Sequence, residues 1–97
     1  AMAMRITDGH STLGYSCDTA YDEDLIEWLS DADLIIHESS LGAAHTPLHK
    51  LMALPRELRQ KMLVVHYPDE MIGAEIEGLV LASEGTSYPV DVRRAAV

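Results

Sequence analysis

The sequence predicts an α/β fold, in which a β-sheet carries flanking helices. Between residues 12 and 65 short apolar stretches alternate with stretches of helical period, in the order strand, helix, strand, helix, strand. Such alternation implies a parallel sheet with right-handed crossovers. The length of 97 residues leaves room for one small domain, and the 47% apolar composition is typical of a globular chain. We therefore predict a single domain over residues 1–97, with 1–4 as a cloning remnant and 91–97 as a loose tail.

The first third of the chain is expected to form a hairpin and then a helix. Arg5–Thr7 and Thr12–Ser16 are β-tolerant stretches on either side of Asp8-Gly9, a dipeptide typical of hairpins. From Asp22 the period changes to that of a helix, with Asp22 itself as the N-cap. The side chains predicted to share the inner face of this helix are Tyr21, Leu25, Trp28 and Leu29.

The middle of the chain continues the alternation. The apolar run 32–36 predicts a short buried strand, and Thr46-Pro47 predicts a helix that begins with a cap and an N1 proline. Pro55 ends that helix, a further turn or two follows over 56–61, and 62–65 forms the next buried strand. For the tail two interpretations remain: a hairpin of 79–82 with 86–90 around Glu84-Gly85, or a helix end and one strand.

Charge and cysteine content narrow the possible functions. Seven basic against 16 acidic residues give a net charge of -9, which argues against wrapping around nucleic-acid phosphates. A phosphoester substrate stays possible if a bound metal supplies positive charge. The sequence shows no membrane-spanning run and no signal peptide, and its single cysteine fits a reducing compartment, so we expect a cytoplasmic protein.

Polar residues follow each of the strands in the predicted parallel sheet. Asp18 follows the first, His37 and Glu38 end the second, and His66 follows the third. The carboxyl ends of parallel strands meet at one edge, where ligands bind. Imidazole and carboxylate groups suit zinc, iron or manganese. His45, just before a helix start, could reach the same edge and exchange a proton.

Each of these residues also has an ordinary structural explanation. An aspartate after a strand is commonly a turn former, a lone histidine a satisfied polar residue, and a glutamate a solvated carboxylate. Neighbouring strand residues point to opposite faces, so Cys17 is expected to point away from Asp18 as a small buried hydrophobe.

Taken together, several segments resemble the metallo-β-lactamase-fold hydrolases. The run Tyr15-Ser16-Cys17-Asp18-Thr19 resembles their Y-S-G-D-T segment, with Cys17 in place of the glycine, and 33–38 resembles the strand that follows. His45-Thr46 resembles the His-Thr or His-Ser pair of the phosphodiesterase and tRNA-processing ribonuclease branch. Val65-His66-Tyr67 resembles the segment with the last metal histidine.

The resemblance implies a role for each matching residue. Asp18 would match the aspartate that bridges two metal ions, and His66 the last histidine ligand. Glu38 and His45 would match catalytic residues that support the ligands or transfer protons. The implied cofactor is a pair of zinc ions, with manganese or iron as alternatives, and the implied reaction is attack on a phosphodiester by a metal-bridging hydroxide.

The departures from the family predict an incomplete site. The motif H-x-H-x-D-H is absent, so the chain is interpreted as the C-terminal half of the αββα sandwich. It supplies two of about seven expected ligands, whereas a catalytic zinc needs about three from the protein. We therefore expect this piece alone to be inactive and to bind metal weakly, and its natural partner to be the missing N-terminal half.

A half-sandwich should also expose one face of its sheet. The apolar candidates for that face are Leu13, Tyr15, Ile35, Leu63 and Val65. A face of this kind usually finds a partner, so we expect the piece to form a homo-oligomer. The alternative to a hydrolase is a non-catalytic α/β association module that oligomerises through this face.

Overall fold

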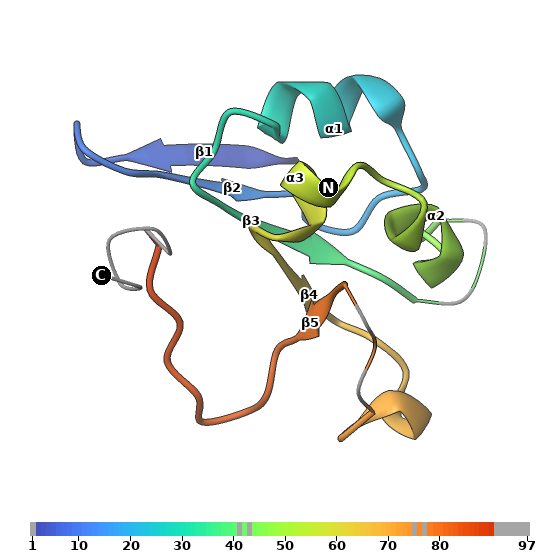
Figure 1. The fold of residues 1–97 in the computed structure, drawn as a ribbon. Helices are drawn as coiled ribbons and strands as arrows, with labels where there is room; N and C mark the ends of the chain where they lie inside the picture. The colour runs from blue at the N-terminus through green and yellow to red at the C-terminus, as the bar shows by residue number, and fades with distance from the viewer. Residues whose placement is uncertain (1, 41, 43, 75, 77, 91–97) are drawn as a thin grey trace.

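The centre of the structure is a mixed five-stranded sheet with the order β1-β2-β3-β4-β5. The computed structural model describes residues 2–40, 42, 44–74, 76 and 78–90. The strands are β1 (Met4–Thr7), β2 (Thr12–Tyr15), β3 (Leu34–Glu38), β4 (Met62–Val65) and β5 (Val80–Leu81). The helical elements are α1 (Glu23–Leu29), α2 (Leu48–Met52), α3 (Arg56–Arg59) and the 3-10 turn η1 (Asp69–Met71). The prediction of a sheet with flanking helices is therefore confirmed (Figure 1).

The N-terminal hairpin and the first helix form where the sequence predicts them. β1 and β2 pair antiparallel, and in the turn Asp8 Oδ1 accepts hydrogen bonds from the backbone N–H groups of His10 and Ser11, both at 2.9 Å. The side chain of Asp22 caps α1 by accepting from the N–H groups of Asp24 and Leu25. From β2 onward the strands pair in parallel, as expected for strands joined through helices.

One face of the sheet carries the hydrophobic core beneath α1 and α2. Side chains from both helices, from β3 and β4 and from the segments that connect the elements form this cluster, which consists of Ile26, Leu29, Ala32, Ile35, Leu51, Leu54, Met62, Val64 and Leu79. Gly14 in β2 allows α1 to approach closely, because a Cβ atom there would lie 2.9 Å from Cδ2 of Leu29. The first helix is thereby packed directly against the strand that leads to Asp18.

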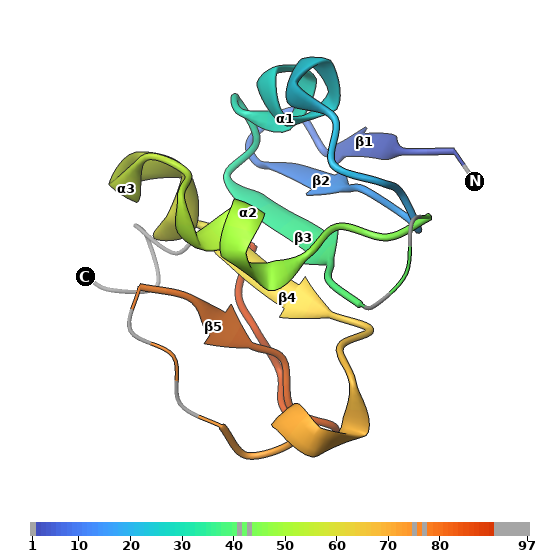
Figure 2. The same ribbon diagram turned by 90° about the vertical axis from the view of Figure 1, so that its right-hand side faces the viewer.

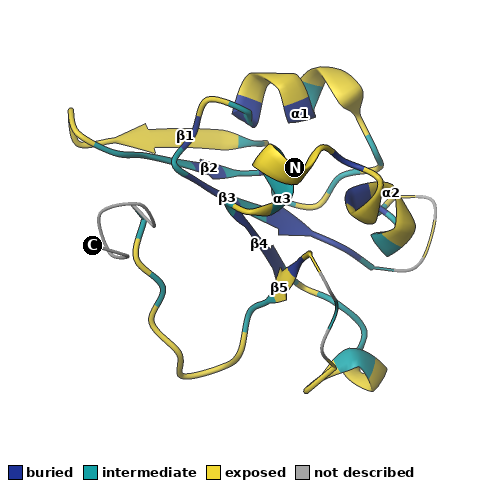
Figure 3. Ribbon diagram, viewed as in Figure 1, coloured by how far each residue is buried: buried dark blue, intermediate teal, exposed yellow. Residues whose placement is uncertain are grey.

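The opposite face is only partly covered. Strand register places Leu13, Tyr15, Leu63 and Val65 on this face, as predicted. The placement of Ile35 there was wrong: it pairs with Gly14 and Met62 and lies in the core beneath the helices. Met4, Ile6 and Val80 remain 44%, 55% and 52% exposed, so large apolar side chains are exposed on the two edge strands. Figure 3 shows exposed positions in both β1 and β5.

Several element predictions differ from the structure. Trp28 is 46% exposed rather than buried, and its ring lies 5.7 Å from the guanidinium carbon of Arg5. β3 begins two residues later than predicted, and α2 begins at Leu48 with Pro47 as a cap that lacks a side-chain hydrogen bond. Thr46 does not cap this helix, because its hydroxyl donates instead to the carbonyl of Thr19 at 2.8 Å.

The tail contributes one strand rather than a hairpin. β5 pairs parallel with β4, while residues 86–90 form no strand and neither segment forms a helix end. The hairpin interpretation was therefore wrong, and of the alternative only the single strand is found. Figure 2 shows the segment after β4 turning back to place β5 beside it. The predicted loose tail 91–97 lies outside the described residues. Within the described ranges, no helix combines the length and apolar character that a bilayer crossing needs.

Candidate metal centre

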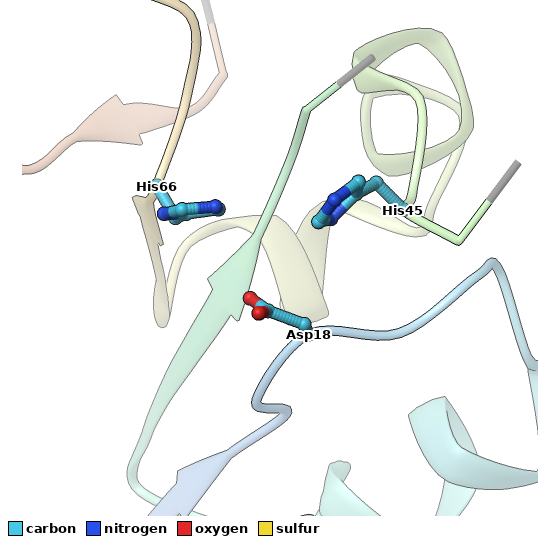
Figure 4. A group of neighbouring side chains, drawn as sticks. All are labelled: Asp18, His45 and His66. Carbon is cyan, nitrogen blue, oxygen red and sulfur yellow. The ribbon is translucent and has the colours of Figure 1, made fainter. Parts of the chain in front are cut away.

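Three side chains converge at the carboxyl edge of the parallel strands. Asp18 follows β2, His66 follows β4, and His45 comes from the loop between β3 and α2. One ligand atom from each lies within 4.8 Å of the others, and Figure 4 shows the three groups pointing towards a common space. The structure thus brings together Asp18 and His66, which the sequence suggested as metal ligands, and adds His45 to the same cluster.

The backbone turns sharply beside two of these residues. Cys17 and His66 have φ angles of 53° and 54°, and they are the non-glycine residues with positive φ in the described ranges. A left-handed residue costs roughly 1–2 kcal/mol outside glycine, so both strands end in strained geometry next to the cluster. Strain of this kind persists only where the surrounding structure holds the turn in place.

Cys17, whose backbone is left-handed, contacts the N-terminal segment of the chain. Its Sγ donates to the backbone carbonyl of Met2 at 2.8 Å, and the residue is half-buried. The expectation of a small buried hydrophobe was therefore wrong, because Cys17 is only half-buried. A glycine at this position, as in the family pattern, would adopt the observed φ without strain.

Glu38 lies behind the cluster and fixes the orientation of His45. Its side chain is 1% exposed, and Oε2 lies 3.0 Å from Nδ1 of His45. Oε1 accepts from the backbone N–H of Thr46 at 2.7 Å and from that of Thr19 at 3.3 Å. A carboxylate only accepts, so the contact places a proton on Nδ1 of His45 and leaves Nε2 as its free nitrogen.

Further hydrogen bonds join the loops around Glu38. Its backbone N–H donates to Oγ of Ser16 at 3.0 Å, and Oγ of Ser39 donates to the carbonyl of Thr46 at 3.0 Å. Thr46 and Ser16 are buried, and neither was singled out as a site residue from the sequence. Both residues lie in segments that resemble the family, but no local pattern indicated these contacts, because they depend on the packing of segments distant along the chain.

His37, the neighbour of Glu38, lies outside the cluster. It is 1% exposed, and its Nδ1 lies 2.8 Å from the carbonyl of Glu38. Burial lowers the pKa of His37 below its ordinary value, while the hydrogen bond to Glu38 and the carboxylate charge oppose that shift. The ring is therefore neutral at neutral pH, and Nδ1–H donates to the strand-end carbonyl.

The donor set fits a divalent transition-metal cation. Two imidazoles and a carboxylate are typical ligands of zinc, manganese or iron. Ligand atoms around a tetrahedral zinc lie roughly 3.4 Å apart, given metal–ligand distances near 2.1 Å. The three ligand atoms lie within 4.8 Å of one another, and the exposed side chains of Asp18 and His66 can rotate to bring them closer.

Known proteins resemble this chain in sequence and in fold. The family model described as "Anti-Pycsar protein Apyc1" matches residues 1–82. The cAMP/cGMP-dependent 3',5'-cAMP/cGMP phosphodiesterase B of Dictyostelium discoideum is 39% identical over 72 residues, covering 56% of this chain and 7% of that protein. The probable metallo-hydrolase YhfI of Bacillus subtilis is 46% identical over 41 residues, covering 42% of this chain and 17% of that protein.

The fold comparison gives the same result. The crystal structure of the metallo-β-lactamase fold protein YhfI from Bacillus subtilis superposes with a TM-score of 0.64 at 26% identity. The match covers 90% of this chain and 43% of that chain, so this chain spans less than half of its structural relative. The resemblance to metallo-β-lactamase-fold hydrolases is confirmed, and the chain belongs to the family described as anti-Pycsar protein Apyc1.

Proposed function

We propose that this chain forms part of a metal-dependent phosphodiesterase that hydrolyses 3',5'-cyclic nucleotides. The observation that carries the proposal is the convergence of Asp18, His45 and His66 at one sheet edge. The substrate class is supported by relatives whose names describe cAMP and cGMP phosphodiesterases. The net charge of -9 is consistent with a need for bound cations to neutralise a phosphodiester.

The residues of the cluster have distinct roles in this proposal. Asp18 and His66 would hold the metal. We propose zinc as the metal, with further ligands from outside this chain. When bound, divalent cations activate water for attack and neutralise charge on the phosphoester.

His45 and Glu38 act as a pair. Glu38 holds Nδ1 of His45, so the unprotonated Nε2 would face the cluster, where it can bind a cation or accept a proton from the attacking water. Burial of Glu38 excludes water from this contact and keeps the ring in one orientation. The pair therefore contributes positioning and proton transfer, whichever cation is bound.

The test is hydrolysis of cyclic AMP and of bis-p-nitrophenyl phosphate with zinc, manganese or iron. In the full-length protein, Asp18→Ala and His66→Ala should each lower activity at least about 100-fold, because each removes a metal ligand. Asp31→Ala and His49→Ala are matched controls, since both residues are exposed and lie outside the cluster. Activity that survives both cluster substitutions would contradict the proposed site.

The partly covered sheet face favours a second candidate, an association module. Met4, Ile6 and Val80 are large exposed apolar residues on this face, and such a surface commonly binds a partner. In this alternative the chain forms a homo-oligomer through this face. In the hydrolase proposal, an N-terminal half of the domain would pack against the same face instead. Light scattering separates the cases: a monomer of this chain at high concentration would contradict self-association, whereas an oligomer that Ile6→Lys dissociates would support it.

A further inference from the structure

A cavity of about 620 Å³ opens directly beside the metal centre. His66 lines the cavity as well as belonging to the ligand cluster, so the two spaces are adjoining. The volume lies in the range typical of small-molecule sites. A group attached to a phosphoester at the cluster can therefore extend into this cavity.

The walls come from the chain on either side of β5. One wall includes Asp69 and Ile72, at and just after η1, and the other includes Ala82 and Glu84, after β5. The hydroxyl of Tyr67 donates to the carbonyl of Ala82 at 2.5 Å, which ties the walls together. The cavity is thus held by contacts within this chain.

The side chains that line it combine apolar surface with negative charge. Val65, Ile72 and Ala82 supply apolar contacts, and Ile72 is 70% exposed, which leaves its side chain available to a ligand. Asp69 and Glu84 are the carboxylates at the cavity, and the described lining residues include no lysine or arginine. An uncharged organic group can pack against the apolar part and donate hydrogen bonds to the carboxylates. A group with additional negative charge meets like charge without compensation.

We propose that this cavity receives the nucleoside part of the substrate and that Asp69 and Glu84 exclude groups with further negative charge. This inference rests on the proposed phosphodiesterase function and adds selectivity to it. Small phosphodiesters with one negative charge are accepted, and polyanionic ones, including nucleic-acid strands, are rejected. Asp69 and Glu84 are specificity-determining residues that leave the chemistry at the metal unchanged.

The test compares two chromogenic substrates that release the same p-nitrophenol. Thymidine 5'-(p-nitrophenyl phosphate) carries one negative charge, and its 3'-phosphorylated counterpart adds a charge of about -2 near neutral pH. In the full-length protein we expect kcat/KM to favour the first substrate. The double variant Asp69→Asn, Glu84→Gln should reduce that preference about tenfold at low ionic strength, and less in high salt.

Control variants distinguish an effect of charge at the cavity from an effect of the protein's net charge and from a general loss of activity. Glu27→Gln with Asp31→Asn makes the same chemical change at exposed positions outside the cavity and should leave the preference unchanged. Should the double cavity variant fail to fold, Glu84→Gln alone provides the test, with a smaller expected change. If Asp18→Ala inactivates the enzyme but the cavity substitutions leave the substrate preference unchanged, this inference alone is overturned. Absence of Asp18-dependent hydrolysis of either substrate overturns the proposed function and this inference with it.

Discussion

Replacing Glu38 by glutamine should change the protonated nitrogen of His45. The glutamine carbonyl can keep the position of Oε1, which accepts from the N–H groups of Thr46 and Thr19. Its amide NH₂ then faces Nδ1 of His45, where Oε2 lies at 3.0 Å in the native chain. Two donors cannot share one contact, so Nδ1 must become the acceptor and the proton moves to Nε2.

The magnitudes follow from the number of contacts that each substitution keeps. Glu38→Gln keeps the backbone contacts and loses only a charge-assisted hydrogen bond, at a cost of about 1 kcal/mol in unfolding free energy. Glu38→Ala leaves the buried N–H of Thr46 and that of Thr19 without an acceptor, at about 3 kcal/mol. Protonation of Nε2 takes away the lone pair with which His45 can bind a cation, so metal affinity should fall about 10–100-fold.

The assay is two-bond ¹H–¹⁵N NMR correlation of the histidine rings at pH 7.5, which identifies the protonated nitrogen without any substrate. The native chain should show a proton on Nδ1 of His45, and Glu38→Gln should show it on Nε2. Glu57→Gln, in the exposed first turn of α3, is the matched control. Retention of the Nδ1–H form in Glu38→Gln would refute the reasoning, as would metal affinity within twofold of native in the full-length protein.

Three further predictions concern stability. Gly14→Ala should lower the unfolding free energy by about 1–3 kcal/mol in urea titrations, because the new Cβ would lie 2.9 Å from Leu29; an unchanged midpoint would contradict the close packing of α1. Cys17→Gly should be more stable than Cys17→Ala by about 1 kcal/mol in thermal melts, since both lose Sγ and only glycine adopts φ of 53° freely; equal stability would argue against strain. Burial lowers the pKa of His37 in the folded chain, so the unfolded chain binds the proton first and stability should fall as pH drops below 6.5. In urea titrations at pH 7.5 and 5.5, His37→Leu should show a smaller loss of unfolding free energy than the native chain. An equal loss in both proteins would exclude His37 as the source of the pH dependence.

The order of elements could be predicted from sequence because each depends on local patterns. The Asp-Gly turn, the Asp22 cap and the apolar runs of β3 and β4 are all contiguous signals. Their alternation was enough to place the ends of the parallel strands at one edge, and hence to group Asp18 with His66. The strand-end rule thus found residues of the candidate site that lie far apart in sequence.

What failed were features set by contacts between distant segments. A shift of one residue exchanges the two faces of a strand, which is why Ile35 was assigned to the wrong face. Trp28 has the helical spacing of a core residue, yet it contacts Arg5 at the surface. Thr46 looks like a cap in sequence, but its hydroxyl and N–H bind Thr19 and Glu38, which no local pattern could indicate.

The buried N–H of Thr46 also makes the candidate site measurable before any substrate is known. The backbone nitrogen of Thr46 lies 2.7 Å from Oε1 of Glu38, so its proton can exchange with deuterium only when the loop before α2 opens. Its exchange rate therefore reports the equilibrium between the assembled and the open loop at one atom. A cation that binds only the assembled loop shifts the equilibrium away from the open loop, and the exchange should slow by the same factor. One amide signal would therefore give both the free energy of loop opening and the affinity for the cation.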